Sequence, residues 1–103
     1  MQIEDITVGE GAECQSNSTI KVHYRGTLLD GTEFDSSYGR GQPIDFPLRK
    51  LIVGWQEGIP GMKGGGKRKL VIPWQKAYGE HGHPPAIPPK ADLIFEIELL
   101  GVR

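Results

Sequence analysis

The chain has 103 residues, of which 37% are hydrophobic, and a formal net charge of −1 from 12 basic and 13 acidic side chains. This length suits a single domain over residues 1–103 with a modest core. The balanced charge offers no general attraction for nucleic acid, whose binding depends on neutralising phosphates with basic side chains. No apolar run approaches the ~20 residues of a membrane helix, and the acidic start lacks the pattern of a signal peptide.

Cys14 is the only cysteine, so the chain cannot form an internal disulfide. A chain without disulfides is typical of a reducing compartment, and we therefore expect a cytoplasmic protein. Nothing in the sequence indicates an oligomer, and we expect a monomer. Glycine (15 residues) and proline (8 residues) are frequent, so ordered turns and loops must take up part of the chain.

The first part of the chain carries patterns typical of strands. A weak pattern covers residues 2–8, and a strong one covers residues 19–28, where apolar and polar side chains alternate with period two. In the strong pattern the apolar face holds Ile20, Val22, Tyr24 and Leu28, and the wet face holds Lys21, His23, Arg25 and Thr27. Asp30-Gly31 then predicts a hairpin that returns as a strand over residues 32–35.

The middle of the chain predicts a loop, an edge strand and one helix. Residues 36–42 read as a loop, and residues 43–48 as a short edge strand because prolines interrupt the alternation. Residues 51–62 contain the one predicted helix, since apolar side chains recur there at helical spacing, and Pro60 and Gly61 should end it after about two turns. Gly54 and Gly58 weaken this helix by about 1 kcal/mol each relative to alanine, so we expect them to allow close approach to a sheet.

A glycine-rich stretch, GMKGGGKRK (61–69), resembles a phosphate-binding loop at first sight. The P-loop pattern requires a serine or threonine after the lysine, where this chain has Arg68. A P-loop also follows a strand and opens a helix, whereas this stretch follows the predicted helix and opens a strand over residues 67–73. We therefore interpret it as a turn that does not bind nucleotide.

The last part of the chain contains a long loop and a final strand. Residues 73–91 are rich in proline and glycine, and a loop of this length in a small domain is usually functional. Residues 92–101 alternate clearly and predict a strand. The sum is an α+β fold, in which a curved antiparallel sheet of about five strands covers one short helix.

Covalent and metal chemistry both lack a motif. Serine, histidine and aspartate occur, but no serine lies in a G-x-S-x-G context. His81 and His83 are two residues apart, and the lone Cys14 and distant His23 do not complete a zinc site. We expect no metal and no cofactor.

Aromatic side chains, in contrast, come from almost every element and should converge between helix and sheet, with Asp35 directly after Phe34 at the rim. An apolar pocket with few polar groups is typical of a small-ligand site. The alternative is that these aromatic residues form only the hydrophobic core.

Four segments carry a resemblance to a known family: VHYRGTLLDGTEFDSS, GWQEGIPGMKGGGKRKLVIP, AYGEHGHPPAIPP and ADLIFEIELLGV. Over residues 3–102 the chain resembles the FKBP-type peptidyl-prolyl cis/trans isomerases. The resemblance implies a curved sheet over one short helix, rotation of Xaa-Pro bonds as the activity, and proline-containing peptides and unfolded protein segments as partners. It also implies binding of macrolides such as rapamycin or tacrolimus.

The resemblance assigns the site residue by residue. It implies four catalytic residues: Trp55 as the floor of the binding cavity, Tyr78 with its phenol, Asp35 with its carboxyl group, and Ile52 with a backbone N–H that bonds the peptide. Arg40 would pair with Asp35 or Tyr78. The expected substrate-binding residues are Tyr24, Phe34, Arg40, Phe46, Leu51, His83, Ile87 and Phe95.

This sequence departs from the family pattern in several places. The segment PLRKLIVGW is about two residues shorter than usual, Ile44 replaces an aromatic residue, and Trp74 and Pro85-Ala86 are unusual. Asp35 could orient Arg40 and Tyr78 or interact with the rotating carbonyl, and the sequence does not choose between these roles. A catalytically weak binding module that uses the same pocket is the alternative to the enzyme, and a metal-dependent protein using His81 and His83 is a third reading.

Overall fold

The computed structural model describes residues 1–103. It contains one α-helix and six strands, which are β1 (Gln2–Thr7), β2 (Thr19–Leu28), β3 (Glu33–Ser36), β4 (Ile44–Pro47), α1 (Val53–Gly58), β5 (Lys67–Ile72) and β6 (Leu93–Val102). Short 3₁₀ turns cover Tyr38–Arg40, Leu48–Lys50 and Trp74–Lys76. The sheet has six strands where about five are predicted, and the predicted α+β class with one short helix is confirmed.

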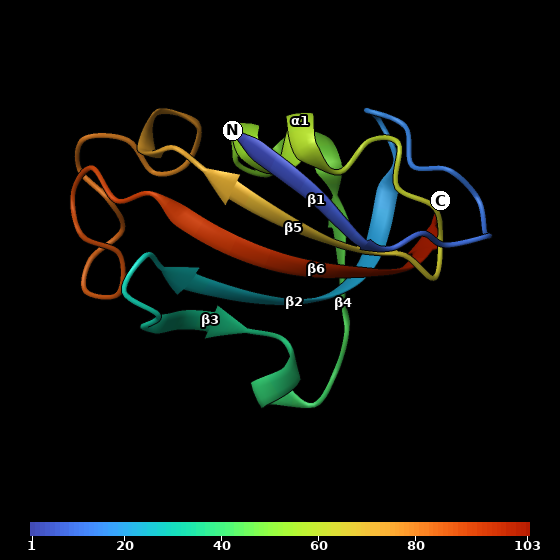
Figure 1. Ribbon diagram of the computed structural model, residues 1–103, viewed down its shortest axis with the longest axis horizontal. Coiled ribbons are helices and arrows are strands. Elements are labelled where there is room, and N and C mark those ends of the chain that lie inside the picture. Colours follow the sequence, from blue (N-terminus) through green and yellow to red (C-terminus); the bar gives the residue numbers. More distant parts are fainter.

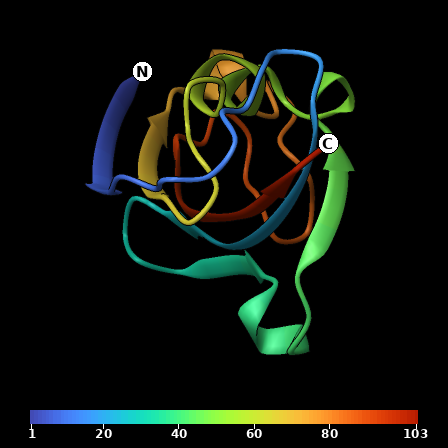
Figure 2. The ribbon, with the colours of Figure 1, turned by 90° about the vertical axis from the view of Figure 1, so that its right-hand side faces the viewer.

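The strands form one antiparallel sheet in the order β1-β5-β6-β2-β3, and β4 also pairs with β2. The sheet curves, and α1 lies within the curve (Figures 1 and 2). The two long strands β2 and β6 lie side by side at its centre, with Tyr24 opposite Ile97. Their alternate apolar side chains are buried against α1 and form most of the core: Ile20, Val22, Tyr24, Leu93, Phe95, Ile97 and Leu99.

Thr27 departs from the predicted alternation. The pattern places it on the wet face, but it is 7% exposed, and Leu28 is only half-buried. The pairing of β2 with β3 shifts register between Gly26 and Thr27. Because a bulge moves the following residues relative to the partner strand, the simple period-two rule does not hold at this end of β2.

The helix approaches the sheet closely at its glycines, as predicted. A Cβ atom on Gly54 would lie 2.5 Å from Ile72 Cγ2, and one on Gly58 would lie 2.7 Å from Leu70 Cδ1. The helix begins two residues later than the apolar spacing predicts, because Ile52 is extended (ψ 153°), and it ends before Pro60, which has no N–H to continue the ladder, as predicted. Leu51 and Ile52 therefore precede the helix instead of belonging to it.

The glycine-rich turn is part of the framework. Its amides donate to backbone carbonyls, with Gly64 bonded to Ala12, Gly65 to Leu99 and Gly66 to Lys63. Arg68 forms an ion pair with Asp5 and also donates to the Gly58 carbonyl. These bonds tie the turn to the N-terminal segment, β6 and the end of α1, which gives the turn a structural role.

The loop between β5 and β6 closes on itself. The Trp74 amide donates to Asp92 Oδ1 at 2.9 Å, across the two ends of the loop. Within the loop, the amides of His83 and Ile87 donate to each other's carbonyls (2.9 and 3.0 Å).

A search of the helices for a segment both long and apolar enough to cross a membrane finds none.

Candidate active site

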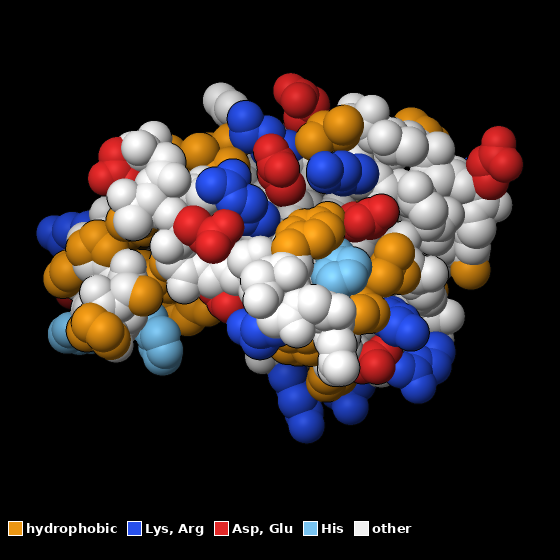
Figure 3. All heavy atoms as spheres, turned by 90° about the horizontal axis from the view of Figure 1, so that it is seen from below, with side chains coloured by type: hydrophobic (Ala, Val, Ile, Leu, Met, Phe, Trp, Pro, Cys, Tyr) orange, Lys and Arg blue, Asp and Glu red, His pale blue; other side chains and the backbone are white.

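A cavity of about 240 Å³ lies between α1 and the sheet. Its lining comes from β2, β3, β4, the start of α1, β6 and the loop after β5, and comprises Tyr24, Phe34, Asp35, Phe46, Leu51, Ile52, Trp55, Tyr78 and Phe95. All nine are among the predicted site residues. Figure 3, which views the molecule from below, shows a recess with hydrophobic side chains at the lower left.

The aromatic side chains form an ordered cluster around Trp55, which is 4% exposed. The rings of Tyr24, Phe46 and Phe95 lie 5.4, 5.9 and 5.2 Å from the indole at interplanar angles of 81°, 87° and 88°. Edge-to-face packing of this kind is favourable and directional. The indole thus has a fixed orientation, and it forms the cavity floor that the sequence predicts.

Gly26 makes room for one wall of the cavity. A Cβ atom at Gly26 would lie 2.6 Å from the Phe34 ring and 2.9 Å from the Phe95 ring. These two rings pack edge to face, with centroids 5.5 Å apart. Without the side chain at position 26, both rings can lie against the β2 backbone. No pattern in the sequence indicates this role of Gly26.

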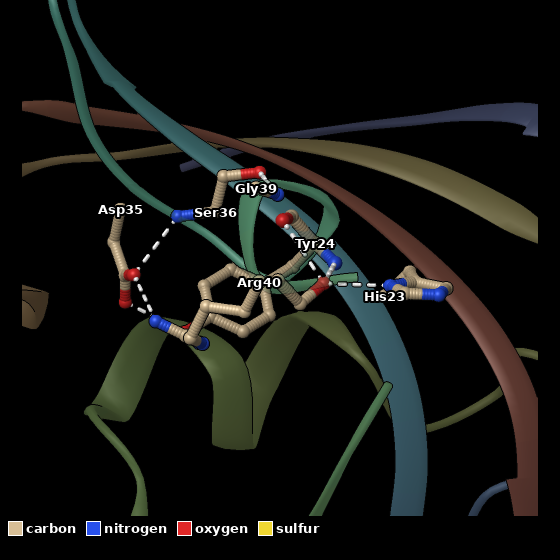
Figure 4. Close-up of polar contacts among 7 residues, drawn as sticks. His23, Tyr24, Asp35, Ser36, Gly39 and Arg40 are labelled. Atoms are coloured by element: carbon tan, nitrogen blue, oxygen red, sulfur yellow. Dashed lines mark hydrogen bonds and ion pairs between the residues drawn. The ribbon is translucent and has the colours of Figure 1, made fainter. Parts of the chain in front are cut away.

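A polar network includes two of the lining residues, Tyr24 and Asp35 (Figure 4). The Tyr24 hydroxyl donates to Asp35 Oδ2 (2.6 Å), Arg40 donates to Asp35 Oδ1 (2.9 Å), and the Ser36 amide donates to the same Oδ1 (2.8 Å). Arg40 also donates to the Tyr24 hydroxyl (3.0 Å). Of the two predicted partners of Arg40, Asp35 and Tyr78, the structure shows Asp35, and Tyr24 is a further partner that the sequence does not indicate.

Sequence reasoning missed the polar role of Tyr24, which it placed among the wall residues. The available signal was the residue type, because a buried tyrosine usually finds a partner for its hydroxyl. Burial raises the pKa of Tyr24, and the bond to Asp35 raises it further. The phenol therefore stays protonated and acts as a donor to Asp35 at neutral pH.

Asp35 is held in the ionised form. Burial alone would raise the pKa of Asp35, but the hydrogen bonds from Tyr24 and Arg40 outweigh it and lower the pKa below its ordinary value. Because the carboxylate already accepts from three donors, its lone pairs are directed mainly at the protein. The two donor side chains are consequently fixed at the cavity edge.

The lowered pKa of Asp35 predicts how stability depends on pH. A group whose pKa is lower in the folded state stabilises the fold above its unfolded pKa of about 4, and this contribution is lost as the pH falls through the folded pKa. We expect the difference in unfolding free energy between wild type and Asp35→Asn to be constant from pH 6 to 8 and to shrink below about pH 4. Urea denaturation of both proteins across this range measures it, and a difference that grows on acidification would contradict the assignment.

Several donors on lining residues, three of which matter for the chemistry of the site, have no hydrogen-bond acceptor within the chain. These three are the Ile52 amide, the Tyr78 hydroxyl and Nε1 of Trp55, the last of which is buried. Burial and the nearby charge of Asp35 raise the pKa of Tyr78, so its phenol also stays protonated. The shortened segment before α1 does not displace Ile52, because the Leu48–Lys50 turn brings Leu51 and Ile52 to the cavity.

The remaining predicted site residues lie outside the cavity lining. Arg40 reaches the site only through Asp35 and Tyr24. The His83 ring lies 5.3 Å from the Tyr78 ring, and Ile87 is buried, 3% exposed. His83 and Ile87, which are expected to bind substrate, thus do not line the cavity itself, and of the two His83 lies beside the lining residue Tyr78. No group of three or more histidine, cysteine, aspartate and glutamate side chains is assembled.

The cavity lies between a curved sheet and one short helix, and its aromatic lining carries donors without a partner. This combination is typical of a domain that binds a small apolar group through a few directed hydrogen bonds. The family model described as FKBP-type peptidyl-prolyl cis-trans isomerase matches residues 10–100. The chain is 53% identical over 102 residues to an FK506-binding protein of Neisseria meningitidis serogroup B, with 97% of this chain and 94% of that protein covered.

A second relative is longer than this chain. FkpA of Escherichia coli K12, an FKBP-type peptidyl-prolyl cis-trans isomerase, is 49% identical over 98 residues, which cover 95% of this chain but only 36% of FkpA. The crystal structure of FkpA superimposes with a TM-score of 0.92 at 48% identity and covers 98% of this chain and 47% of that one. The chain thus belongs to the FKBP-type peptidyl-prolyl cis-trans isomerase family and spans about a third of the length of FkpA.

Proposed function

We propose that this domain catalyses cis-trans isomerisation of Xaa-Pro bonds in peptides and unfolded protein segments. The observation that carries the proposal is the aromatic cavity over Trp55 with the unpaired Ile52 amide at its edge. Membership of the isomerase family supports the same conclusion.

The cavity can lower the barrier without covalent chemistry. Amide resonance imposes a rotation barrier of roughly 18–20 kcal/mol, and uncatalysed isomerisation of Xaa-Pro takes about 10–100 s. Resonance is lost in the perpendicular amide, which is therefore less polar than either planar form. Transfer from water to aromatic walls favours this twisted state over the ground state, and only such differential binding accelerates a step.

The polar groups have separate tasks in this mechanism. The Ile52 amide and the Tyr78 hydroxyl are free to donate to carbonyl groups of the peptide and so hold the chain while the bond rotates. Asp35 keeps Tyr24 and Arg40 in place. The sequence leaves two roles open for Asp35: to orient neighbouring side chains or to interact with the rotating carbonyl. Its three hydrogen bonds favour the orienting role, and the tyrosine that it orients is Tyr24 instead of Tyr78.

A protease-coupled isomerisation assay tests the proposal. We expect this domain to accelerate isomerisation of a Leu-Pro or Phe-Pro peptide in proportion to its concentration, and to do so equally in the presence of a metal chelator. A rate equal to that in buffer, together with measurable ligand binding, would instead identify the domain as a binding module.

Substitutions of the polar residues should reduce turnover only partly. We expect Asp35→Ala and Tyr78→Phe each to lower kcat/KM by about 5- to 30-fold, because each removes one hydrogen-bonding group worth about 1–2 kcal/mol and neither breaks a covalent step. The same peptide assay measures both. Complete loss of activity in Asp35→Ala, with fold and ligand affinity intact, would contradict the non-covalent mechanism.

The same cavity is proposed to bind macrolides of the rapamycin or tacrolimus type. The relative from Neisseria meningitidis named as an FK506-binding protein supports this proposal. We expect macrolide to change the fluorescence of Trp55, and Trp74→Phe removes the background of the second indole. Titration by fluorescence and calorimetry provides the measurement, and a flat response in both would exclude binding.

We also propose that the protein is a cytoplasmic monomer, as its composition predicts. The buried free thiol of Cys14 and the balanced charge support this proposal. Light scattering and cell fractionation provide the tests.

A further inference from the structure

The turn that carries Arg40 is attached to β2 through Ser37, which is completely buried. The Ser37 amide donates to the Tyr24 carbonyl (2.9 Å), and its hydroxyl oxygen accepts from the Tyr24 amide (2.7 Å). His23 Nδ1 lies 2.9 Å from the same hydroxyl (Figure 4). Ser37 thus fixes the start of the turn next to the residue whose phenol belongs to the cavity network.

The next residue, Tyr38, fixes the turn on the outer face of the sheet, away from the cavity. Its ring stacks on His23 with centroids 4.6 Å apart and planes 12° apart, and its hydroxyl donates to Glu98 Oε1 (3.1 Å). His23 on β2 and Glu98 on β6 are opposite each other in the sheet. We call His23, Tyr38 and Glu98 the outer-face clamp.

The hydroxyl of Tyr38 remains a donor over the whole working range of pH. Burial and the charge of Glu98 raise the pKa of Tyr38 to about 12. Tyr38 is nevertheless 44% exposed, and the turn Tyr38–Arg40 contains no buried residue. The clamp therefore orders an exposed turn and adds little to the hydrophobic core.

Two residues after Tyr38, the chain reaches the cavity side. The Arg40 amide donates to the Ser37 carbonyl (3.2 Å), and the Gly41 amide donates to the Tyr38 carbonyl (3.1 Å), so the turn is short and internally bonded. The Arg40 guanidinium contacts only Asp35 and Tyr24 among polar groups. A displacement of Tyr38 is thereby transmitted to the partners of Arg40.

We propose that His23, Tyr38 and Glu98 are positioning residues for the isomerisation site: by fixing the turn on the outer face of the sheet, they hold Arg40 against Asp35 and Tyr24 at the cavity edge. This inference rests on the proposed function and extends it to three residues that line no part of the cavity.

A double-mutant cycle between Tyr38 and Arg40 tests the inference. We expect Tyr38→Leu to lower kcat/KM about three- to tenfold, and to have no further effect when Arg40 is already leucine, because groups that act through one another are not additive. Glu98→Leu should reproduce part of the loss, whereas Glu98→Gln, which keeps a carbonyl acceptor for Tyr38, should restore activity close to wild type.

The matched control is Glu33→Leu, which removes the exposed ion pair between Arg25 and Glu33 beside the same strands. We expect it to leave kcat/KM unchanged. Three outcomes would each overturn the inference. They are an equal loss of activity from Tyr38→Leu in the wild-type and Arg40→Leu backgrounds, no loss from Tyr38→Leu, and no effect of Arg40→Leu.

A second measurement separates this inference from the proposed function. Nuclear magnetic resonance relaxation of Arg40 Nε reports the order of its side chain without any peptide. We expect Arg40 to become mobile in Tyr38→Leu and to stay ordered in Glu33→Leu. If the wild type isomerises no peptide, the proposed function fails, and the relaxation data still decide the positioning role: unchanged order in Tyr38→Leu would refute it.

Discussion

Replacement of Trp55 by alanine is expected to lower the free energy of unfolding by about 3–5 kcal/mol, as for other large buried aromatics. The indole is 4% exposed and packs edge to face with three rings, so its removal leaves a void that those rings cannot fill without losing their mutual geometry. Urea denaturation followed by circular dichroism gives the stability. We expect macrolide binding and isomerisation to fall together, because the same void removes the cavity floor.

Two further variants keep this prediction testable if Trp55→Ala does not fold. Trp55→Phe retains an apolar floor and should fold with reduced affinity for macrolide. Trp74→Phe is the matched control, since Trp74 is only half-buried and lies outside the cavity. Its ring lies under Lys90, whose Nζ is 5.8 Å from the ring centroid. A folded Trp55→Ala with wild-type turnover would show that the aromatic floor does not carry the catalysis.

Replacement of Gly54 by alanine is expected to destabilise the fold by about 2 kcal/mol, although alanine is the better helix former by about 1 kcal/mol. The new Cβ would lie 2.5, 2.6 and 2.8 Å from Cγ2, Cδ1 and Cγ1 of Ile72, which is fully buried. The helix must then move from the sheet, and Trp55 and the Ile52 amide move with it. Chemical denaturation and the peptide assay should both detect the change.

The steric cause of this destabilisation is tested by removing the Ile72 side chain. In an Ile72→Ala background, Gly54→Ala should no longer destabilise, because the side chain that it meets is gone and the gain in helix propensity remains. Gly39→Ala is the control for glycine replacement itself, since a Cβ at Gly39 would meet nothing within 4 Å. Equal destabilisation by Gly54→Ala with and without the Ile72 side chain would refute the steric explanation.

The sequence placed the cavity residues well and their polar contacts poorly. All nine lining residues follow from the family resemblance, since motif positions map onto walls and floor. The resemblance predicts that Arg40 pairs with Asp35 or Tyr78; Asp35 is indeed a partner, but the second partner is Tyr24. Which of two tyrosines meets an arginine depends on angstrom-scale distances between separate strands and loops, and no periodicity in the chain encodes these distances.

Local properties were determined by the sequence alone: the six strands follow from alternation, the hairpin from Asp30-Gly31, and the close helix contact from Gly54. These features depend on neighbours within a few residues, so a pattern can reveal them. Only the tertiary structure decided that Tyr24 belongs to the polar network, that Thr27 is buried, and that Tyr38 stacks on His23. Each of these results from side chains that meet across strands or across a bulge, where the outcome is set by packing in three dimensions.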